Sequence, residues 1–267
     1  MKLSLRVFWL VLLGLVAYIV FLLVSLPAAQ AWSWFGSRVP AQAFGLSGTV
    51  WHGQAAVVIQ QGRRLEAVQW DLKPASLLLG RLQANVQARL PNGRLRGDVT
   101  IAPGGRFAGQ QLRLDMPAPE LLQWAGLSSK LPVRVEGQLD TLMRDLAVNG
   151  PRVERADGLI SWHGAAIRFG SAPLPLGDLA LRLEPGTGGT NGTLTNQGGA
   201  IDLGGTMRLS PDGRFVLDLA VQARDNPDQE TVPAMKLLGI PTDGSKVQAR
   251  LSGNLDGSGL KLEPIGR

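Results

Sequence analysis

Apolar and polar residues alternate along several segments of the chain, and this pattern constrains the fold more than any other feature. In residues 82–90 every even position is apolar and every odd position is polar or charged. A half-buried strand has this period of two, whereas a helix repeats every 3.6 residues. Clean alternation is also typical of antiparallel sheets with one solvated face. The same period recurs in residues 68–73, 95–101, 133–140, 215–222 and 247–255.

Turn signals separate these segments. Asn-Gly and Asp-Gly dipeptides favour tight hairpins because they tolerate positive φ. They occur at 92–93, 191–192, 212–213, 243–244 and 256–257. The Gly- and Thr-rich stretch 185–199 is interpreted as a loop or a long hairpin tip. We therefore predict a mainly β fold with one continuous antiparallel sheet, curved or folded over.

Helices are expected to be few and short. Each candidate is followed by a glycine that could cap it, at positions 80, 126 and 239. The candidates span residues 75–79, 119–125 and 232–238.

The segment from Val7 to Leu26 contains no charged residue. As a helix it would be about 30 Å long, the thickness of the hydrocarbon core of a bilayer. Lys2 and Arg6 precede it and the next basic residue is Arg38, so the positive-inside rule predicts a cytoplasmic N-terminus and an exported remainder.

We accordingly predict a cytoplasmic stub at 1–6, a transmembrane helix acting as a signal anchor at 7–26, and a juxtamembrane linker at 27–45. A cleaved signal peptide is the alternative, because Ala29-Gln30-Ala31 resembles a cleavage site.

Four short motifs occur twice in the same order. Trp51-His52-Gly53 matches residues 162–164, and the Gly-Arg-Phe of 105–107 matches that of 213–215. Residues 121–126 resemble 234–239, and 137–140 resemble 253–256. Four matches in the same order, at offsets of 108 to 116 residues, indicate internal duplication. We predict two similar β repeats of about 110 residues each. They are placed at 46–147 and 157–267, with a connection at 148–156.

Composition excludes several chemistries. The chain has no cysteine and only two histidines, His52 and His163, which excludes disulfides, thiol catalysis and three-histidine metal centres. Neither histidine has an evident acidic partner or a nucleophile motif nearby, so strand packing explains them better than catalysis. We predict no catalytic residue, metal ligand or cofactor, and no enzyme activity. The net charge of +6 is spread without a basic run, which favours a solvated surface, or contact with anionic lipid, over nucleic acid.

Carboxylates are expected on the outward positions of strands and in turns, as a solvated face. A glycosidase needs two of them held close together, and the pattern selects no such pair. They are Asp71, Asp98, Asp115, Glu136, Asp140, Asp218 and Asp256.

The apolar face of such a sheet must be covered by the sheet itself, by another protein or by a lipid chain. Small residues on this face indicate a shallow groove. They are Ala84, Ala88, Gly97, Ala249 and Gly253.

The segment 46–82 carries three linked patterns, G-T-x-W-x-G, V-x-W-x-L-x-P and L-L-x-G-x-L. With the N-terminal apolar segment, they resemble protein N of the type II, or general, secretion pathway. The second Trp-His-Gly tripeptide lacks the downstream Trp and Pro, so the motif applies to the first repeat only. The motif residues, structural or interacting, are Gly48, Thr49, Trp51, Gly53, Trp70, Leu72, Pro74, Leu77, Leu78, Gly80 and Leu82.

The resemblance implies an accessory component of the inner membrane of Gram-negative bacteria, with a periplasmic main domain. It would assist export of folded proteins across the outer membrane by docking inner-membrane secretion subunits or the outer-membrane secretin. The alternative comes from a more distant resemblance to AsmA-like envelope proteins. It implies a module that binds or transfers lipid on the apolar face of the sheet.

Overall fold

The computed structural model describes residues 5–36, 39–60, 62–124, 126, 133–170, 172–224 and 228–264; the side chains of residues 5–8, 35 and 169 are not described. The helices are α1 (Leu5–Val24), α2 (Ala28–Phe35), α3 (Pro74–Leu77), α4 (Ala118–Trp124) and α5 (Val232–Leu237). The first strands are β1 (Gln42–Phe44), β2 (Ser47–Gly48), β3 (His52–Gln60), β4 (Arg63–Leu72), β5 (Leu82–Leu90), β6 (Gly93–Ala102), β7 (Arg106–Pro117) and β8 (Arg134–Asn149). The remaining strands are β9 (Arg152–Phe169), β10 (Ala172–Gly186), β11 (Gly189–Gln197), β12 (Ile201–Leu209), β13 (Arg214–Ala223), β14 (Lys246–Asn254) and β15 (Lys261–Pro264).

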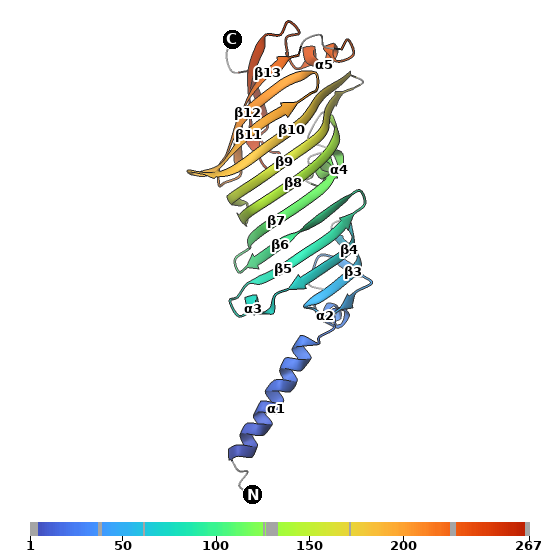
Figure 1. Cartoon of the computed structure of the whole chain (residues 1–267), viewed down its shortest axis with the longest axis vertical. Helices are drawn as coiled ribbons and strands as arrows, with labels where there is room; N and C mark the ends of the chain where they lie inside the picture. Colours follow the sequence, from blue (N-terminus) through green and yellow to red (C-terminus); the bar gives the residue numbers. More distant parts are fainter. Residues whose placement is uncertain are drawn as a thin grey trace.

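All fifteen strands belong to one sheet, and from β3 to β15 each strand pairs with the next one in the sequence. Every pairing is antiparallel, as hairpin connections require. Figure 1 shows an elongated, twisted sheet from one end of which α1 projects. The sheet is not closed, since β1 and β15 lie at its two edges. The predicted mainly β, antiparallel and continuous sheet is confirmed.

The alternation in the sequence corresponds to the two faces of the sheet. In β5, Ala84, Ala88 and Leu90 are buried, while Gln87 and Arg89 are exposed. We call the face that carries Ala84 and Ala88 the apolar face, and the opposite one the polar face.

The predicted turns are correct in part. Asp212-Gly213 and Asp256-Gly257 lie in turns with positive φ at the glycine, 86° and 77°. Asp243-Gly244 lies between α5 and β14 rather than in a hairpin. At 92–93 the hairpin loop is formed by Pro91 and Asn92, and Gly93 already belongs to β6.

Asn191-Gly192 is not a turn. Both residues lie inside β11, opposite Glu184 and Leu183 of β10, and the hairpin tip is at 187–188. Gly192 is placed there by packing, because a Cβ would lie only 3.0 Å from the Cβ of Met207. The stretch 185–199 is therefore a hairpin tip, as predicted, but most of it is strand.

The three short helices are confirmed as α3, α4 and α5. Gly80, Gly126 and Gly239 follow them with φ of 65°, 69° and 68°, the left-handed conformation that ends a helix.

The buried apolar core is uneven along the sheet. The larger cluster joins β9 to β13 with α5, whose Ala234 and Met235 are 0 % exposed. A smaller cluster surrounds Met143, Ala156 and Leu183. Among the described residues, β3 to β6 contribute to neither cluster. The helix α4 packs against β7 and β8, and Arg63 of β4 donates a hydrogen bond to the carbonyl oxygen of its last residue, Trp124.

The N-terminal segments differ from the prediction in detail. Most of the predicted anchor lies in α1, while residues 1–4 of the stub are outside the described residues. None of the helices, as far as the described residues go, combines the length and apolarity that crossing a bilayer requires. The linker at 27–45 contains α2 and β1, and the connection at 148–156 is the hairpin of β8 and β9. The duplication into two repeats stays a prediction.

Candidate functional site

The end of α1 is hydrogen-bonded to the edge of the sheet by the first of the three motif patterns. The indole Nε1 of Trp51 donates to the carbonyl oxygen of Leu23, in the last turn of α1, at 2.7 Å. The amide of Val50 donates to the carbonyl oxygen of Leu26 at 3.0 Å, and Pro27 forms a β-bridge with Thr49. These contacts determine where α1 leaves the sheet.

The second pattern immobilises the loop that makes these contacts. The indole Nε1 of Trp70 in β4 donates to the carbonyl oxygen of Val50 at 2.9 Å. Gly53 is needed beneath this ring, because a Cβ at position 53 would collide with the ring of Trp70 and lie 2.6 Å from the carbonyl oxygen of Thr49. Gly48 adopts a φ of 80°, which favours glycine. The amide of Leu72 donates to the carbonyl oxygen of Trp51 at 2.7 Å.

The third pattern forms α3 and the turn that follows it. Pro74 occupies the first turn of α3, where its missing N–H costs nothing. The buried hydroxyl of Ser76 donates to the carbonyl oxygen of Lys73 at 2.6 Å and accepts from the amide of Gln83 at 3.2 Å. Leu77 and Leu78 are exposed, and Leu82 begins β5.

The motif residues, predicted from the sequence without a defined role, therefore gather at one end of the sheet. We call this region the junction, comprising residues 23–27, 48–53 and 70–82. Its contacts to α1 are accepted by main-chain carbonyls of residues 23 and 26, for which the sequence contains no signal.

The two histidines lie on exposed strand positions, and each has an acidic neighbour that the sequence analysis missed. Nδ1 of His52 is 3.0 Å from a carboxylate oxygen of Asp71, and Nδ1 of His163 is 3.9 Å from one of Asp178. Each aspartate lies on the following strand, so hairpin register could have found it. The expectation that the histidines lack acidic partners is wrong.

The two histidines do not come together. Five strands separate β3 from β9, so at about 4.8 Å per strand they are about 29 Å apart. Within the described part of the chain, no group of three or more His, Asp or Glu side chains is placed to hold a metal ion.

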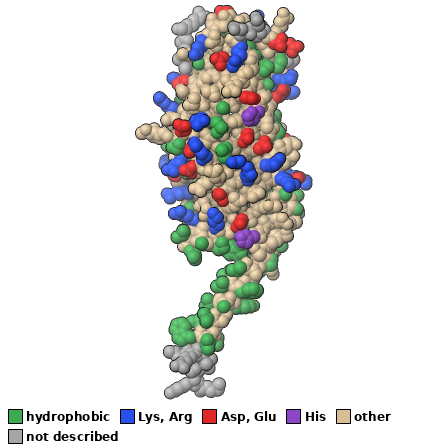
Figure 2. Space-filling model, in the orientation of Figure 1, with side chains coloured by type: hydrophobic (Ala, Val, Ile, Leu, Met, Phe, Trp, Pro, Cys, Tyr) green, Lys and Arg blue, Asp and Glu red, His purple; other side chains and the backbone are tan. Residues whose placement is uncertain are grey.

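The polar face of the first strands is hollowed beside the junction. One hollow of about 490 Å³ is lined by Gly48, His52, Trp70 and Asp71, among others. A second hollow of about 670 Å³ shares Gln69 and Gln87 with the first. Figure 2 shows basic and acidic side chains gathered on the face drawn there.

Four arginines line the larger hollow, and they form two like-charged pairs. Arg89 lies directly opposite Arg94, and Arg96 directly opposite Arg113. Like charges in these positions destabilise a sheet. None of the four forms an ion pair with a carboxylate of the described residues. We call them the arginine cluster.

The predicted outward carboxylates are solvated and several are paired. Asp218 lies beside Arg250 at 2.6 Å, and Glu136 beside Arg168 at 2.5 Å. Hydrogen bonding by the Arg250 guanidinium lowers the pKa of Asp218, and Arg214 similarly lowers the pKa of Asp212. The pKa of Asp243 is lowered by the backbone N–H of Ser245. These contacts are typical of a surface, and the prediction of no catalytic pair stays a prediction.

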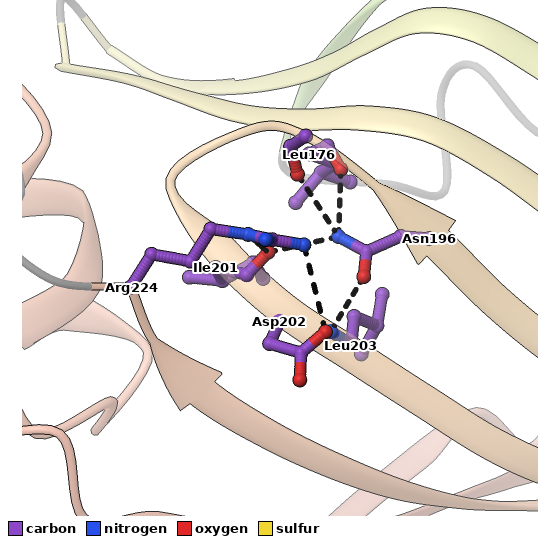
Figure 3. Close-up of polar contacts among 7 residues, drawn as sticks. Leu176, Asn196, Ile201, Asp202, Leu203 and Arg224 are labelled. Carbon is purple, nitrogen blue, oxygen red and sulfur yellow. Dashed lines mark hydrogen bonds and ion pairs between the residues drawn. The ribbon is translucent and has the colours of Figure 1, made fainter.

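A polar network in the second half of the sheet was not foreseen (Figure 3). The side-chain amide of Asn196 donates to the carbonyl oxygens of Leu176 and Ile201, at 2.9 and 2.8 Å, and accepts from the amide of Leu203. Arg224 donates to the same carbonyl of Ile201. The network closes the end of the β11 and β12 hairpin and is structural.

Comparison with known proteins gives consistent results. The family described as type II secretion system (T2SS), protein N, matches residues 40–250. A type II secretion system protein N of Aeromonas hydrophila is 27 % identical over 249 residues, covering 91 % of this chain and 96 % of that protein. A type II secretion system protein N of Vibrio cholerae is 33 % identical over 157 residues, covering 58 % of this chain and 61 % of that protein. One from Klebsiella pneumoniae is 26 % identical, covering 81 % and 83 %.

No solved structure matches the chain. The family match spans most of the chain, including all three motif patterns of the junction. The chain therefore belongs to the type II secretion system protein N family.

Proposed function

We propose that this protein is an accessory component of the inner-membrane part of the type II secretion system, with α1 as a single-pass anchor and the sheet in the periplasm. It would act by docking other secretion components and not as an enzyme. The observation that carries the proposal is the junction. Thr49 and Trp51 of the predicted motif contact the chain at the end of α1, and Trp70 holds the loop that carries them.

The anchor is supported by the side chains of α1. Large apolar residues such as Leu10, Leu13 and Phe21 are 67 %, 66 % and 65 % exposed, and α1 projects away from the other described elements (Figure 1). Lys2 and Arg6 precede the uncharged segment and favour a cytoplasmic N-terminus.

The anchor can be tested in cells. After alkaline extraction of membranes, the full chain should stay in the membrane pellet. In intact spheroplasts, a protease added from outside should digest the sheet and spare a tag fused to the N-terminus. Release by alkali would refute the anchor, and a protected sheet would refute the proposed orientation.

The arginine cluster is the proposed docking surface for a secretion partner. The hollow holds four arginines, two pairs of them directly opposed, against two carboxylates, Asp115 opposite Arg94 and Asp140. This excess of positive charge is costly in the isolated sheet, and an acidic segment of a partner would reduce it. Because Arg binds carboxylates with two parallel hydrogen bonds, such a contact would also be selective.

Charge reversal tests this surface. The double variant R96E/R113E should lose several-fold in the recovery of inner-membrane secretion subunits or the secretin after detergent solubilisation. The matched control is R106E/R152E, with the same change of charge at hairpin turns away from the cluster. Equal recovery with both variants would refute the docking surface while leaving the anchor intact.

A second candidate function is lipid binding on the apolar face, as in AsmA-like proteins. It is favoured by exposed apolar side chains where β5 begins and β6 ends, since Leu82 and Ile101 are 40 % and 48 % exposed. A photoreactive residue at Ile101 should crosslink to phospholipid in cells, and one at Gln87 on the polar face should not. Crosslinks from position 101 to protein alone would rule out this function.

A further inference from the structure

Three consecutive leucines at the tip of α3 are exposed to solvent. Leu77 is 44 % exposed, Leu78 90 % and Leu79 74 %. Single exposed apolar residues are normal on a protein surface, but a run of three is not. Outside α1, Leu78 is the most exposed large apolar side chain of the described residues. We call Leu77, Leu78 and Leu79 the leucine tip.

Backbone hydrogen bonds hold the leucine tip in its exposed position. The amide of Leu79 donates to the carbonyl oxygen of Ser76 at 3.1 Å, and that of Gly80 to the carbonyl oxygen of Leu77 at 2.9 Å. The amide of Arg81 returns to the carbonyl oxygen of Ser76 at 3.0 Å. Gly80 reverses the chain with a φ of 65°. Because these bonds fix the turn, the leucines cannot fold back onto the sheet without breaking them.

The leucine tip lies at the end of the sheet from which α1 leaves. Figure 1 shows α3 at this end, beside the junction with α1, and Figure 2 shows apolar side chains gathered there and along α1. Lys73 precedes the tip and Arg81 follows it, and both are exposed. Apolar residues flanked by cations are typical of segments that enter a membrane interface, where long basic side chains reach the phosphates.

We propose that the leucine tip inserts into the surface of the bilayer that α1 crosses, with Lys73 and Arg81 at the lipid phosphates. This inference rests on the anchor proposed above, and the occupant it names is phospholipid. The tip lies at the same end of the sheet as the exposed apolar helix α1 (Figure 1), and its flanking charges complement anionic lipid. A weak contact suffices, because α1 holds the tip at high effective concentration near the membrane.

Insertion would give the sheet a second attachment point, at α3, in addition to its contacts with α1. Two points define the tilt of the sheet relative to the membrane, whereas α1 alone leaves the sheet free to swing. The polar face and its arginine cluster would then be held in one orientation toward partners.

The absence of cysteine allows a direct test on the full chain. Leu78→Cys carries an environment-sensitive fluorophore, and the matched control is Leu237→Cys, 70 % exposed on α5 at the far end of the sheet. Both proteins are reconstituted into vesicles of phosphatidylethanolamine and phosphatidylglycerol. Quenching by nitroxide on the lipid acyl chains should be several-fold stronger at position 78, and quenching by aqueous iodide several-fold weaker.

Equal iodide quenching at positions 78 and 237 would overturn the proposal. The same result is expected if the tip binds a protein partner and not lipid, because the vesicles contain no such partner. If Leu78→Cys does not fold, the measurement is repeated with the fluorophore on Leu79→Cys. Failure of the anchor is seen separately, because the protein would not float with the vesicles at all. Vesicles of phosphatidylcholine alone should weaken the nitroxide quenching, since they lack the net negative charge that attracts Lys73 and Arg81.

Discussion

The first half of the sheet, β3 to β8, and the second half, β9 to β14, contain the same order of elements but are stabilised differently. In each half, four strands precede a turn with the sequence Gly-Arg-Phe at the start of the next strand, and a short helix and a last strand follow; α3, in the first half, has no counterpart in the second. The second half packs α5 into the larger buried cluster. The first half contributes Met143 of β8 to the smaller cluster and hydrogen-bonds its beginning to α1.

The two halves therefore contribute differently: one mainly stabilises the fold, and the other attaches the sheet to α1. The half with the larger core can hold the fold, while the first half presents the arginine cluster and the leucine tip. The tripeptide Trp-His-Gly occurs in both halves, in different surroundings. In the first half it begins β3 at the junction, and in the second it lies within β9.

The largest effect is expected in the core of the second half. Met235→Ala should lower the free energy of unfolding by about 2 to 5 kcal/mol, because it leaves a cavity where the side chain is fully buried. Leu237→Ala, on the exposed side of the same helix, should change it by about 0.5 kcal/mol or less. Denaturant unfolding of the full chain in detergent measures both. Similar losses would contradict the assignment of the core to this half.

The fold was largely predictable because period two and turn chemistry are local signals. Alternation in residues 82–90 predicted β5 and its two faces, and Gly80, Gly126 and Gly239 predicted the ends of the three short helices. The failures are at tertiary contacts. Asn191-Gly192 has the composition of a turn, but both residues lie within β11, where a Cβ on Gly192 would crowd the side chain of Met207 on the adjacent strand.

The next largest effect compares the glycines of the two tripeptides. Gly53→Ala should cost about 1 to 3 kcal/mol, because the new methyl group meets the ring of Trp70 and a backbone carbonyl. Gly164→Ala meets no atom and should cost only about 1 to 2 kcal/mol, from its positive φ of 56°.

Unfolding measurements rank the two glycine variants, and hydrogen exchange locates the damage. Gly53→Ala should speed exchange at residues 49–53, around the contacts to α1, and Gly164→Ala should leave that loop unchanged. Faster exchange of the loop in both variants would mean that the junction depends on the second half.

The tryptophans give a smaller and more specific effect. Trp51→Phe removes the indole donor to the carbonyl oxygen of Leu23, and Trp162→Phe removes the one to that of Glu136. Each should cost about 0.5 to 1.5 kcal/mol. Only Trp51→Phe should widen the distribution of spin-label distances between α1 and the sheet. An unchanged distribution would show that the bridge of Pro27 and Thr49 fixes α1 by itself.

The sequence identified the residues of the candidate site but not their position in the fold. Trp51, Trp70 and Pro74 were identified from their spacing, yet their shared position depends on the pairing of β3 with β4 and on carbonyls of α1. The partners of His52 and Asn196 were missed for the same reason. Both are determined by register between strands, which a single sequence specifies only weakly.

The smallest effect concerns the charges of the polar face, where the halves also differ. Arg96 and Arg113 face each other in the first half, while Asp218 faces Arg250 in the second. The pKa of Asp218 is lowered from its ordinary 3.8, so its contribution to stability is present above that pH and is lost as the pH falls through the lowered value. Asp218→Asn should therefore be less stable than the original protein at pH 6 and equally stable once Asp218 is protonated. Urea unfolding across this pH range measures the convergence. A difference that persists at the acidic end would mean that Asp218 stabilises β13 and β14 through packing and not through its charge.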